Sequence, residues 1–415
     1  MKTNLEQYQK EDHGIFKKDI DPDVITISDT LISNGYQAFV VGGCIRDMLL
    51  GKTPKDFDIA TDASPPEICK LFNKAKIIGR RFKIVHVYTS EKKYFEVTTF
   101  RSDVKKKSNE KKFKKIQGMI KRDNVYGNIS QDAFRRDFTI NSLYLDLDNE
   151  VLHDYVNGID DIKNKKLRLI KKPSISYQED PVRMLRALRF ESKLGLKLTD
   201  ECSESISKMA HMINNVSPFR LFDEILKIMH SGSGVIGYKK LKEYNLFKYL
   251  FPFTNKILED NQIYNDFFIA SLNNTDKRIN DGLHVNPSFI YAVFLWPYFQ
   301  ELEEKYSNKD SLGIDQAFKK VMQTQGEYIA VPDFFQSTIF TIWSLQSSFL
   351  NLSKRNIQYL TGISKFRAAY DFFFIRSLID DDLKPYADKW YEIQKGVKSK
   401  KRERGKKYYG KRKNK

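Results

Sequence analysis

The chain has 415 residues, of which 41% are hydrophobic and 30% are charged, a composition typical of a globular protein with a sizeable core. Its longest apolar runs are far shorter than the roughly 20 residues that span a membrane, and the N-terminus lacks the apolar stretch of a secretory signal. The scattered cysteines Cys44, Cys69 and Cys202 favour reduced thiols in a cytoplasmic protein. These features exclude a membrane-spanning protein and a disulfide-stabilised one.

The formal charge of +18 is concentrated in two segments. Residues 395–415 contain 12 Lys or Arg and one Glu, and residues 105–115 contain seven Lys and one Glu. The remainder of the chain is close to neutral. This distribution favours a polyanionic partner, with nucleic acid as the first candidate. A solubilising tail is the alternative interpretation.

The first part of the chain alternates between helix and strand signals. Residues 1–20 are polar, and we expect them to be flexible. The elements predicted after them are a helix over 21–35, a strand over 36–41 that runs into a Gly42-Gly43 turn, a helix over 44–50, a strand over 57–61, a helix over 64–72, and strands over 83–89 and 94–100. They describe a compact α/β unit.

Beyond this unit the pattern becomes helical. Residues 104–121 contain almost no residues of the buried type and predict a mobile basic loop. Helical spacing dominates after residue 160. The predicted fold class is α+β, with a small mixed α/β head followed by an all-helical neck and body and a disordered basic tail. The predicted domains are a head at 21–160, a neck at 161–250, a body at 251–394 and a tail at 395–415.

The strongest local signal for chemistry is the Gly42-Gly43 turn followed by Asp56-Phe57-Asp58. If both aspartates lie on one strand, their side chains share a face about 6.6 Å apart, which suits Mg²⁺ that bridges to substrate phosphates. The glycine turn before a helix lets backbone N–H groups approach a phosphate, and Arg46 can add a charge-assisted contact. Each motif alone is weak, but their order along the chain is specific.

This order resembles the class II nucleotidyltransferase superfamily, which contains bacterial poly(A) polymerases and CCA-adding tRNA nucleotidyltransferases. The resemblance begins with residues 40–51 and Asp56-Phe57-Asp58. It continues through three further segments, at 135–143, 154–158 and 179–190. It implies a polymerase-beta-like head and the addition of nucleotides without a template.

The resemblance also implies roles for individual residues. Asp56 and Asp58 would bind two Mg²⁺ ions, and Asp137 would be a third functional aspartate near the reaction centre. Glu96, on a predicted strand, is the alternative third carboxylate, and the residues alone leave that choice open. The nucleotide-binding residues would be Gly42, Gly43, Arg46, Arg136, Asp180, Arg183, Arg186 and Arg189. Of these, Asp180 and Arg183 would contact the base edge, and the later arginines would help to hold phosphates.

The segment at 77–87 resembles the corresponding block of the bacterial poly(A) polymerases more than that of the CCA-adding enzymes. The basic tail is also similar to the extensions of poly(A) polymerases. The expected RNA-binding residues are Arg80, Arg81, Lys105, Lys106, Lys107, Lys400, Lys401, Arg402, Arg404, Lys406 and Lys407.

The prediction is therefore a cytoplasmic enzyme of RNA processing and decay that adds AMP from ATP to RNA 3′ ends and releases pyrophosphate. A CCA-adding enzyme is the alternative, and a catalytically silent RNA-binding protein is the third reading. The sequence leaves open whether accessory RNA-decay proteins take part.

Overall fold

The computed structural model describes residues 5–79, 83–90, 93–102, 125–307 and 313–396. The chain divides into two compact units, which are described separately below. The first comprises residues 1–252, 279–281 and 325–330, and the second comprises residues 253–278, 282–324 and 331–415. The predicted loop at 104–121 lies outside the described residues, as does the predicted tail at 395–415 except for Lys395 and Gly396, which are helical. Within those residues, none of the helices has the combined length and apolar character that a membrane crossing requires.

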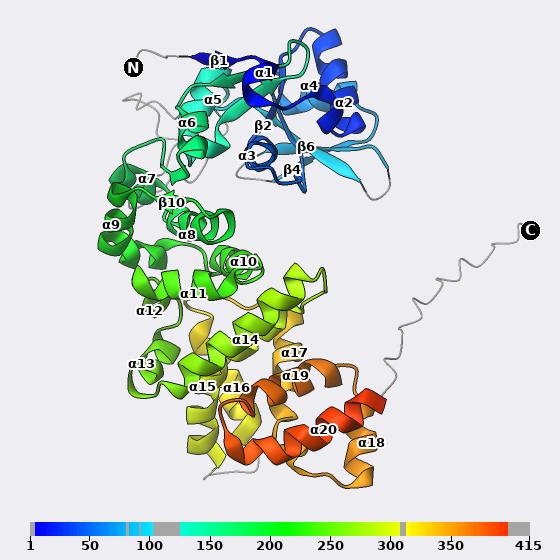
Figure 1. Cartoon of the computed structure of the whole chain (residues 1–415), viewed down its shortest axis with the longest axis vertical. Helices are drawn as coiled ribbons and strands as arrows, with labels where there is room; N and C mark the ends of the chain where they lie inside the picture. The colour runs from blue at the N-terminus through cyan, green and yellow to red at the C-terminus, as the bar shows by residue number, and fades with distance from the viewer. Residues whose placement is uncertain (1–4, 80–82, 91–92, 103–124, 308–312, 397–415) are drawn as a thin grey trace, which may run out of the picture. The chain divides into compact units, whose positions relative to one another are not determined.

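The first unit is built on an eight-stranded mixed sheet with the strand order β1-β8-β7-β2-β3-β6-β5-β4 (Figure 1). The strands are β1 (Glu6–Tyr8), β2 (Ala38–Val41), β3 (Asp58–Thr61), β4 (Ala75–Ile78), β5 (Ile84–Tyr88), β6 (Tyr94–Thr99), β7 (Leu143–Asp146) and β8 (Val151–Asp154). Only β3 and β6 run parallel to each other among these neighbours. A separate pair joins β9 (Lys166–Leu167) to β10 (Lys197–Leu198).

The helices of the first unit form two groups, one interspersed with the strands of the sheet and one that follows them in the chain. Those interspersed with the strands are α1 (Lys10–His13), η1 (Lys17–Asp19), α2 (Pro22–Ser33), α3 (Gly43–Leu49), α4 (Pro65–Leu71), α5 (Ile129–Arg135), η2 (Thr139–Asn141) and α6 (Gly158–Lys163). Those that follow are α7 (Pro173–Glu179), α8 (Val182–Leu194), α9 (Asp200–Met209), η3 (Ala210–Asn215), α10 (Pro218–Met229), α11 (Gly234–Glu243) and α12 (Phe247–Leu250).

The two faces of the sheet have different environments. Strand residues on one face, such as Val40, Ile59 and Val97, are fully buried, and α2 and α4 pack against the strands that carry them. On the opposite face, Phe39 and Val41 belong to a buried cluster that α5 helps to cover. The face under α5 also carries Asp58, because Asp58 pairs with Val41 in the antiparallel register of β2 and β3.

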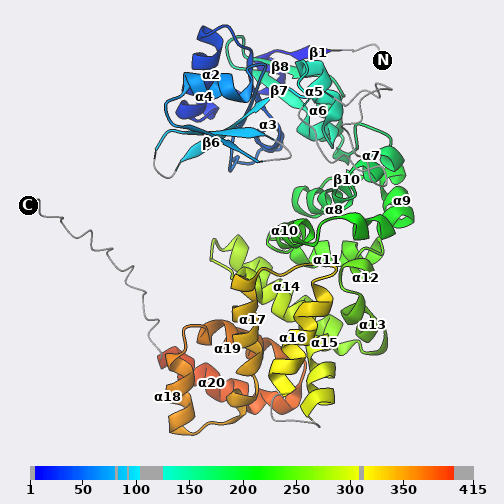
Figure 2. The ribbon, with the colours of Figure 1, turned by 180° about the vertical axis from the view of Figure 1, so that it is seen from behind.

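The N-terminal segment differs from the expectation of a flexible arm. Glu6–Tyr8 forms β1 at the edge of the sheet, antiparallel to β8, and Figure 2 shows these strands side by side. Ile15 and Ile20 are buried, and Lys10 forms an ion pair with Glu150 at 3.1 Å. Pairing with a distant strand and burial of two isoleucines outweigh the polar local composition from which flexibility was predicted.

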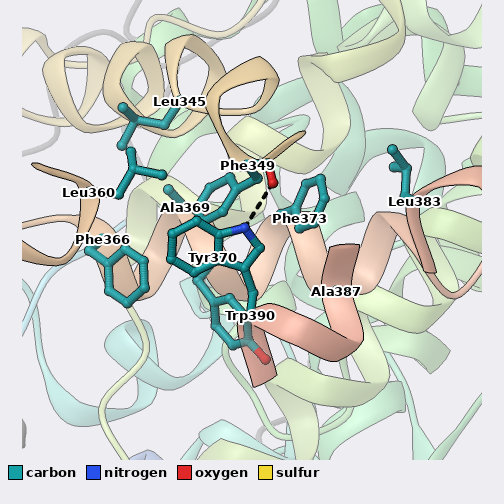
Figure 3. Close-up of a cluster of buried hydrophobic side chains, with 10 residues drawn as sticks. All are labelled: Leu345, Phe349, Leu360, Phe366, Ala369, Tyr370, Phe373, Leu383, Ala387 and Trp390. Atoms are coloured by element: carbon teal, nitrogen blue, oxygen red, sulfur yellow. Dashed lines mark hydrogen bonds between the residues drawn. The ribbon is translucent and has the colours of Figure 1, made fainter. Parts of the chain in front are cut away.

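The second unit is helical. Its elements are α13 (Pro252–Asp260), α14 (Ile263–Asn280), α15 (Pro287–Ser307), α16 (Gly313–Gln325), α17 (Asp333–Ser344), η4 (Ser347–Leu350), α18 (Lys354–Gly362), α19 (Phe366–Arg376), η5 (Asp381–Leu383) and α20 (Lys384–Gly396). Trp390 lies at the centre of an aromatic cluster with Phe349 and Phe373 (Figure 3). Its indole N–H donates to the carbonyl of Phe349 at 2.8 Å. This cluster ties α20 to the helices before it.

Candidate active site

The glycine turn follows β2 directly and lies beside the Asp58 carboxylate of the neighbouring strand β3. Gly42 has φ of +87°, a conformation that favours glycine. A Cβ at Gly42 would lie 3.9 Å from an oxygen of Asp58 and 3.6 Å from a guanidinium nitrogen of Arg136. The turn therefore brings the backbone at the start of α3 beside both charged groups, as a phosphate-binding turn requires.

The carboxylates gather where β3 begins. Asp58 is the first residue of β3 and pairs in register with Glu96 on the parallel strand β6. Burial raises the pKa of Asp58 to about 6, and the negative charges of Glu96 and Asp56 add to this rise, while Arg136 opposes it. Burial and two neighbouring carboxylates thus both disfavour the ionised form of Asp58.

The prediction that Asp56 and Asp58 share one strand is wrong. Asp56 is exposed and precedes β3, after a bend at Lys55. The Phe57 side chain is only partly buried, so the core does not enforce strand geometry before Asp58. The negative charge of Asp56 nevertheless contributes to the raised pKa of Asp58, so the two carboxylates lie close enough to interact electrostatically.

The carboxylates of Asp56 and Asp58 fit a hard divalent cation whose coordination shell is completed by the substrate. Within the part of the chain that the structure describes, no group of three His, Cys, Asp or Glu side chains has a ready metal-binding arrangement. Mg²⁺ commonly takes one or two carboxylates and completes its shell with water and substrate phosphates. Burial raises the pKa of Asp58, and the charges of Glu96 and Asp56 add to the rise, so a bound cation would stabilise the ionised carboxylate.

Asp137 has a different environment from that of Asp58. One of its oxygens accepts from the Nε of Arg186 at 2.6 Å and from its Nη2 at 2.6 Å. The other accepts from the Phe138 N–H at 2.8 Å and from the Asn141 amide at 3.1 Å. Burial opposes ionisation, but the charge of Arg186 and the other donors outweigh it and hold the pKa of Asp137 well below its usual range. The structure thus places Asp137 as an anchor for α8.

Contacts from α6 hold the η2 segment that follows Asp137. Asp161 accepts from the Thr139 hydroxyl at 2.6 Å and from Arg168 at 2.9 Å. A Cβ at Gly158 would lie 2.4 Å from the Thr139 carbonyl oxygen, so only glycine fits there. The segment at 154–161 that carried part of the family resemblance therefore holds η2, which directly follows Asp137.

Arg136 is fixed between Asp132 and Tyr144. Its Nε donates to Asp132 at 3.1 Å and to the Tyr144 hydroxyl at 2.8 Å, and the same hydroxyl donates to Asp132 at 2.7 Å. Burial raises the pKa of Asp132, but the charges of Arg136 and Arg135 outweigh it, so the net shift is downward. The network holds a cationic group beside Asp58.

Three guanidinium groups surround the ring of Phe190. Arg46 lies 5.0 Å, Arg186 5.5 Å and Arg189 4.9 Å from the ring centre. Arg46 also donates to Asp47 at 2.6 and 2.9 Å and to Asn141 at 2.7 Å. Burial lowers the pKa of Arg189, and the charges of Arg186 and Arg46 contribute to this lowering. The cluster joins α3 to α8 and concentrates positive charge opposite the carboxylates.

The next set of site residues lies at the start of α8 and on α10. Asp180 accepts two parallel hydrogen bonds from Arg220, at 2.8 and 2.7 Å. Arg183 donates to the Ser176 hydroxyl at 2.8 Å and lies 3.5 Å from Glu179. Arg220 was not predicted from the sequence, because nothing in its local pattern points to a partner 40 residues away.

A cavity of about 400 Å³ joins these groups. Its lining residues are Val41, Asp58, Glu96, Thr98, Arg101, Asp132, Arg135, Arg136, Asp137, Glu179, Asp180, Arg183, Arg186 and Arg220. Asp58 and Glu96 lie at the sheet end of the cavity, and Arg183, Arg186 and Arg220 lie on α8 and α10. Each side also carries the opposite charge, because Arg136 lies near Asp58 and Glu179 pairs with Arg183. The cavity can therefore accept a cation beside Asp58 and Glu96 and an anionic ligand beside the arginines of α8 and α10. The predicted RNA-binding residues Arg80, Arg81, Lys105–Lys107 and those at 400–407 lie outside the described residues.

Three segments of the chain match known protein families. Residues 38–168 match the family described as the poly A polymerase head domain, residues 195–258 match a probable RNA and SrmB-binding site of polymerase A, and residues 307–415 match the polymerase A arginine-rich C-terminus. The solved structure of the Bacillus stearothermophilus CCA-adding enzyme in complex with CTP is similar, with a TM-score of 0.59 and 21% identity. That alignment covers 90% of this chain and 82% of the other.

The family matches, together with the fold, identify a class II nucleotidyltransferase. Poly(A) polymerase I of Salmonella typhi is 37% identical over 395 residues, which cover 93% of this chain and 85% of that protein. The Haemophilus influenzae poly(A) polymerase I is 37% identical over 94% of this chain and 90% of its own length. A CCA-adding enzyme of Bacillus pumilus is 38% identical, but only over 49% of each chain. The chain belongs to the bacterial poly(A) polymerase family, as the sequence predicted.

The pKa of Asp58 predicts a pH-dependent gain in stability for Asp58→Asn. An acid whose pKa is raised in the folded state makes unfolding easier as pH rises through the interval between its unfolded and folded values, here about pH 4 to 6. Without divalent cations, Asp58→Asn should therefore gain free energy of unfolding relative to the wild type between pH 4 and 7, by up to about 3 kcal/mol. Urea denaturation across this range measures the difference. The exposed Asp160→Asn variant is the control, and a parallel response of both variants would contradict the prediction.

The arginine cluster predicts that Phe190 supports nucleotide binding through its ring. Phe190→Leu keeps an apolar side chain but removes the surface that three guanidinium groups contact, and each such contact is worth about 0.5–2 kcal/mol. We expect the KM for the nucleotide to rise about fivefold or more. The control is Phe138→Leu, since Phe138 contacts Phe190 edge to face at 5.4 Å and its loss perturbs packing. Equal KM values for Phe190→Leu and Phe138→Leu would contradict the prediction and show that Phe190 acts only through packing.

Proposed function

We propose that this protein is a polynucleotide adenylyltransferase that adds AMP from ATP to RNA 3′ ends without a template and releases pyrophosphate. The observation that carries the proposal is the cavity in which the Asp58 carboxylate and the arginines of α8 face one space. Similarity to poly(A) polymerases over nearly the whole chain supports RNA 3′ ends in general, rather than those of tRNA, as the acceptor. RNA processing and decay in the cytoplasm is the corresponding cellular role.

In this proposal the carboxylate end of the cavity binds the reacting groups. Asp56 and Asp58 would hold Mg²⁺, two ions in our reading, which would activate the RNA 3′-hydroxyl and neutralise charge on the phosphates. Gly42 and Gly43 would let backbone N–H groups approach the triphosphate. Arg136, held by Asp132 and Tyr144, stays charged beside it.

The α8 end of the cavity would bind and select the nucleotide. Arg186 and Arg189 on α8, together with Arg46, would contact phosphate oxygens, which guanidinium groups bind through paired donors. Asp180 and Arg183 would contact the base edge. The pairing of Asp180 with Arg220 supports this role, because it fixes the carboxylate in one orientation. Rigid donors and acceptors can select a base without a template strand.

We further propose that Glu96 is the third carboxylate beside the metal site and that Asp137 acts as a positioning residue. Glu96 lies in register with Asp58 and raises its pKa. Both oxygens of Asp137 are occupied by donors, including two nitrogens of Arg186. A carboxylate so engaged is better suited to orient an arginine than to bind a cation.

The basic segments would keep the RNA near the site. Arg80, Arg81, Lys105, Lys106 and Lys107, together with the lysines and arginines at 400–407, supply phosphate-binding charge in the sequence. The matches to an RNA-binding segment and an arginine-rich C-terminus support this part of the proposal. Accessory RNA-decay proteins would also bind through these regions.

A nucleotide-incorporation assay tests the reaction. The purified protein is incubated with Mg²⁺ and either a labelled generic RNA or a tRNA that lacks its CCA end, with ATP or CTP supplied separately. We expect long ATP-dependent tails on the generic RNA, and a loss of at least 100-fold in rate for Asp58→Ala but not for the exposed Asp160→Ala. CTP incorporation confined to the trimmed tRNA would instead identify a CCA-adding enzyme. No incorporation with either substrate would favour a silent RNA-binding protein.

The two candidate third carboxylates predict different kinetic defects. Glu96→Gln should raise the Mg²⁺ concentration needed for half-maximal rate several-fold, because one negative charge near the cation is lost. Asp137→Asn should mainly raise the KM for ATP, because Arg186 loses its charged partner. Titrations of Mg²⁺ and ATP with both variants separate the roles. A larger Mg²⁺ defect in Asp137→Asn than in Glu96→Gln would reverse our assignment.

A further inference from the structure

Three aromatic rings form a contiguous group next to the carboxylates, on the hairpin of β5 and β6. His86 stacks on Tyr94 with ring centres 4.1 Å apart and an angle of 12° between the planes. Tyr88 contacts both, at 6.3 and 5.6 Å. Tyr94 is 47% exposed. We call His86, Tyr88 and Tyr94 the aromatic platform.

Strand register places the platform on the catalytic face of the sheet. Asp58 pairs with Glu96 on β6, and Glu96 pairs with His86 on β5. Directly paired residues point to the same face, so the three side chains form one row, and the His86 ring lies 3.5 Å from the Glu96 carboxylate. Tyr88 and Tyr94 are paired with each other two residues along their strands and so share this face.

The platform lies toward the end of the sheet at which the chain enters β3. β3 and β6 run parallel, Asp58 is the first residue of β3, and Tyr94, the first residue of β6, lies two residues before Glu96. The cavity extends the other way, since its lining includes Glu96 and Thr98 but, among the described residues, none of the three rings. Ligand atoms at the carboxylates can thus have the cavity on one side and the rings on the other.

The hairpin that carries the rings is anchored. Lys93, next to Tyr94, forms ion pairs with Asp21 at 3.0 Å and with Asp23 at 2.6 Å. Thr89, next to Tyr88, donates to Asp23 at 3.0 Å. Because Asp21 is the N-cap of α2 and Asp23 lies in its first turn, Thr89 and Lys93 fix the strand ends that carry Tyr88 and Tyr94 to a helix. The rings are therefore held in place before any ligand binds.

We propose that the aromatic platform binds the 3′-terminal nucleobases of the RNA primer by stacking and so directs its terminal hydroxyl toward Asp56 and Asp58. This inference rests on the proposed function and identifies where its second substrate lies. Stacking on aromatic side chains binds single strands without sequence preference, which suits an enzyme that extends many RNAs. The exposed Lys74 and Lys76 lie beside the platform, with Lys76 5.9 Å from the Tyr88 ring centre, and supply charge for the RNA backbone.

Kinetics distinguish the primer from the nucleotide as the ligand of the platform. For Tyr94→Ala and Tyr88→Ala, we expect the KM for a short oligoadenylate primer to rise about tenfold, the usual size of one lost base stack. The KM for ATP should stay within twofold of the wild type. Tyr94→Phe should retain the wild-type value, since the ring remains. Tyr359→Ala, which removes a tyrosine that is 63% exposed in the second unit, is the matched control, and thermal melting verifies that each variant is folded.

A primer that lacks its two terminal bases provides the complementary test. The wild type should bind this abasic primer about tenfold more weakly than the intact one, and Tyr94→Ala should bind both equally. Fluorescence anisotropy of labelled primers without Mg²⁺ measures this binding independently of catalysis. A rise in the KM for ATP instead would assign the platform to the nucleotide and overturn the proposal, as would an unchanged KM for both substrates. Failure of the wild type to extend any RNA would overturn the proposed function, whereas failure of the platform alone would leave extension intact.

Discussion

The ion pair between Asp137 and Arg186 is the interaction on which the candidate active site depends. Asp137 follows α5 in the sheet-bearing part of the chain, and Arg186 lies on α8. Burying two charges costs free energy that close pairing only partly returns, so we infer that the pair contributes position more than stability. It holds α8 at the distance from the sheet that leaves a cavity of about 400 Å³, and it orders the arginines that line this cavity.

Two aspartates that line the same cavity have opposite electrostatic environments. Burial and the charges of Glu96 and Asp56 raise the pKa of Asp58 to about 6, whereas Arg186 and several hydrogen-bond donors outweigh burial and lower the pKa of Asp137. A bound cation would stabilise the ionised form of Asp58, whereas Asp137 already has the guanidinium group of Arg186 as its cationic partner. Such a separation within one site is how similar side chains acquire different roles. A polyphosphate with its divalent cation matches this polarity, cation toward the sheet and anion toward α8.

Sequence patterns predicted the parts of this site that depend on local order. The Gly42-Gly43 turn before a helix and the carboxylate of Asp58 follow from local motifs, whereas the roles of the arginines on α8 were expected from the family resemblance. Local periodicity could not predict that Asp56 precedes the strand, because Phe57 looks like a core residue but is only partly buried. It also missed β1 and the pairing of Arg220 with Asp180, since partners 40 or 146 residues apart leave no local signal.

Fold and sequence similarity give different information about this chain. The similarity to the CCA-adding enzyme of Bacillus stearothermophilus extends over 90% of the chain at only 21% identity, so the backbone arrangement is common to enzymes with different products. Similarity in sequence to the CCA-adding enzyme of Bacillus pumilus covers about half of the chain, whereas similarity to poly(A) polymerase I covers 93%. The two groups therefore have a similar fold, and we infer that the choice of acceptor depends on side chains rather than on the fold.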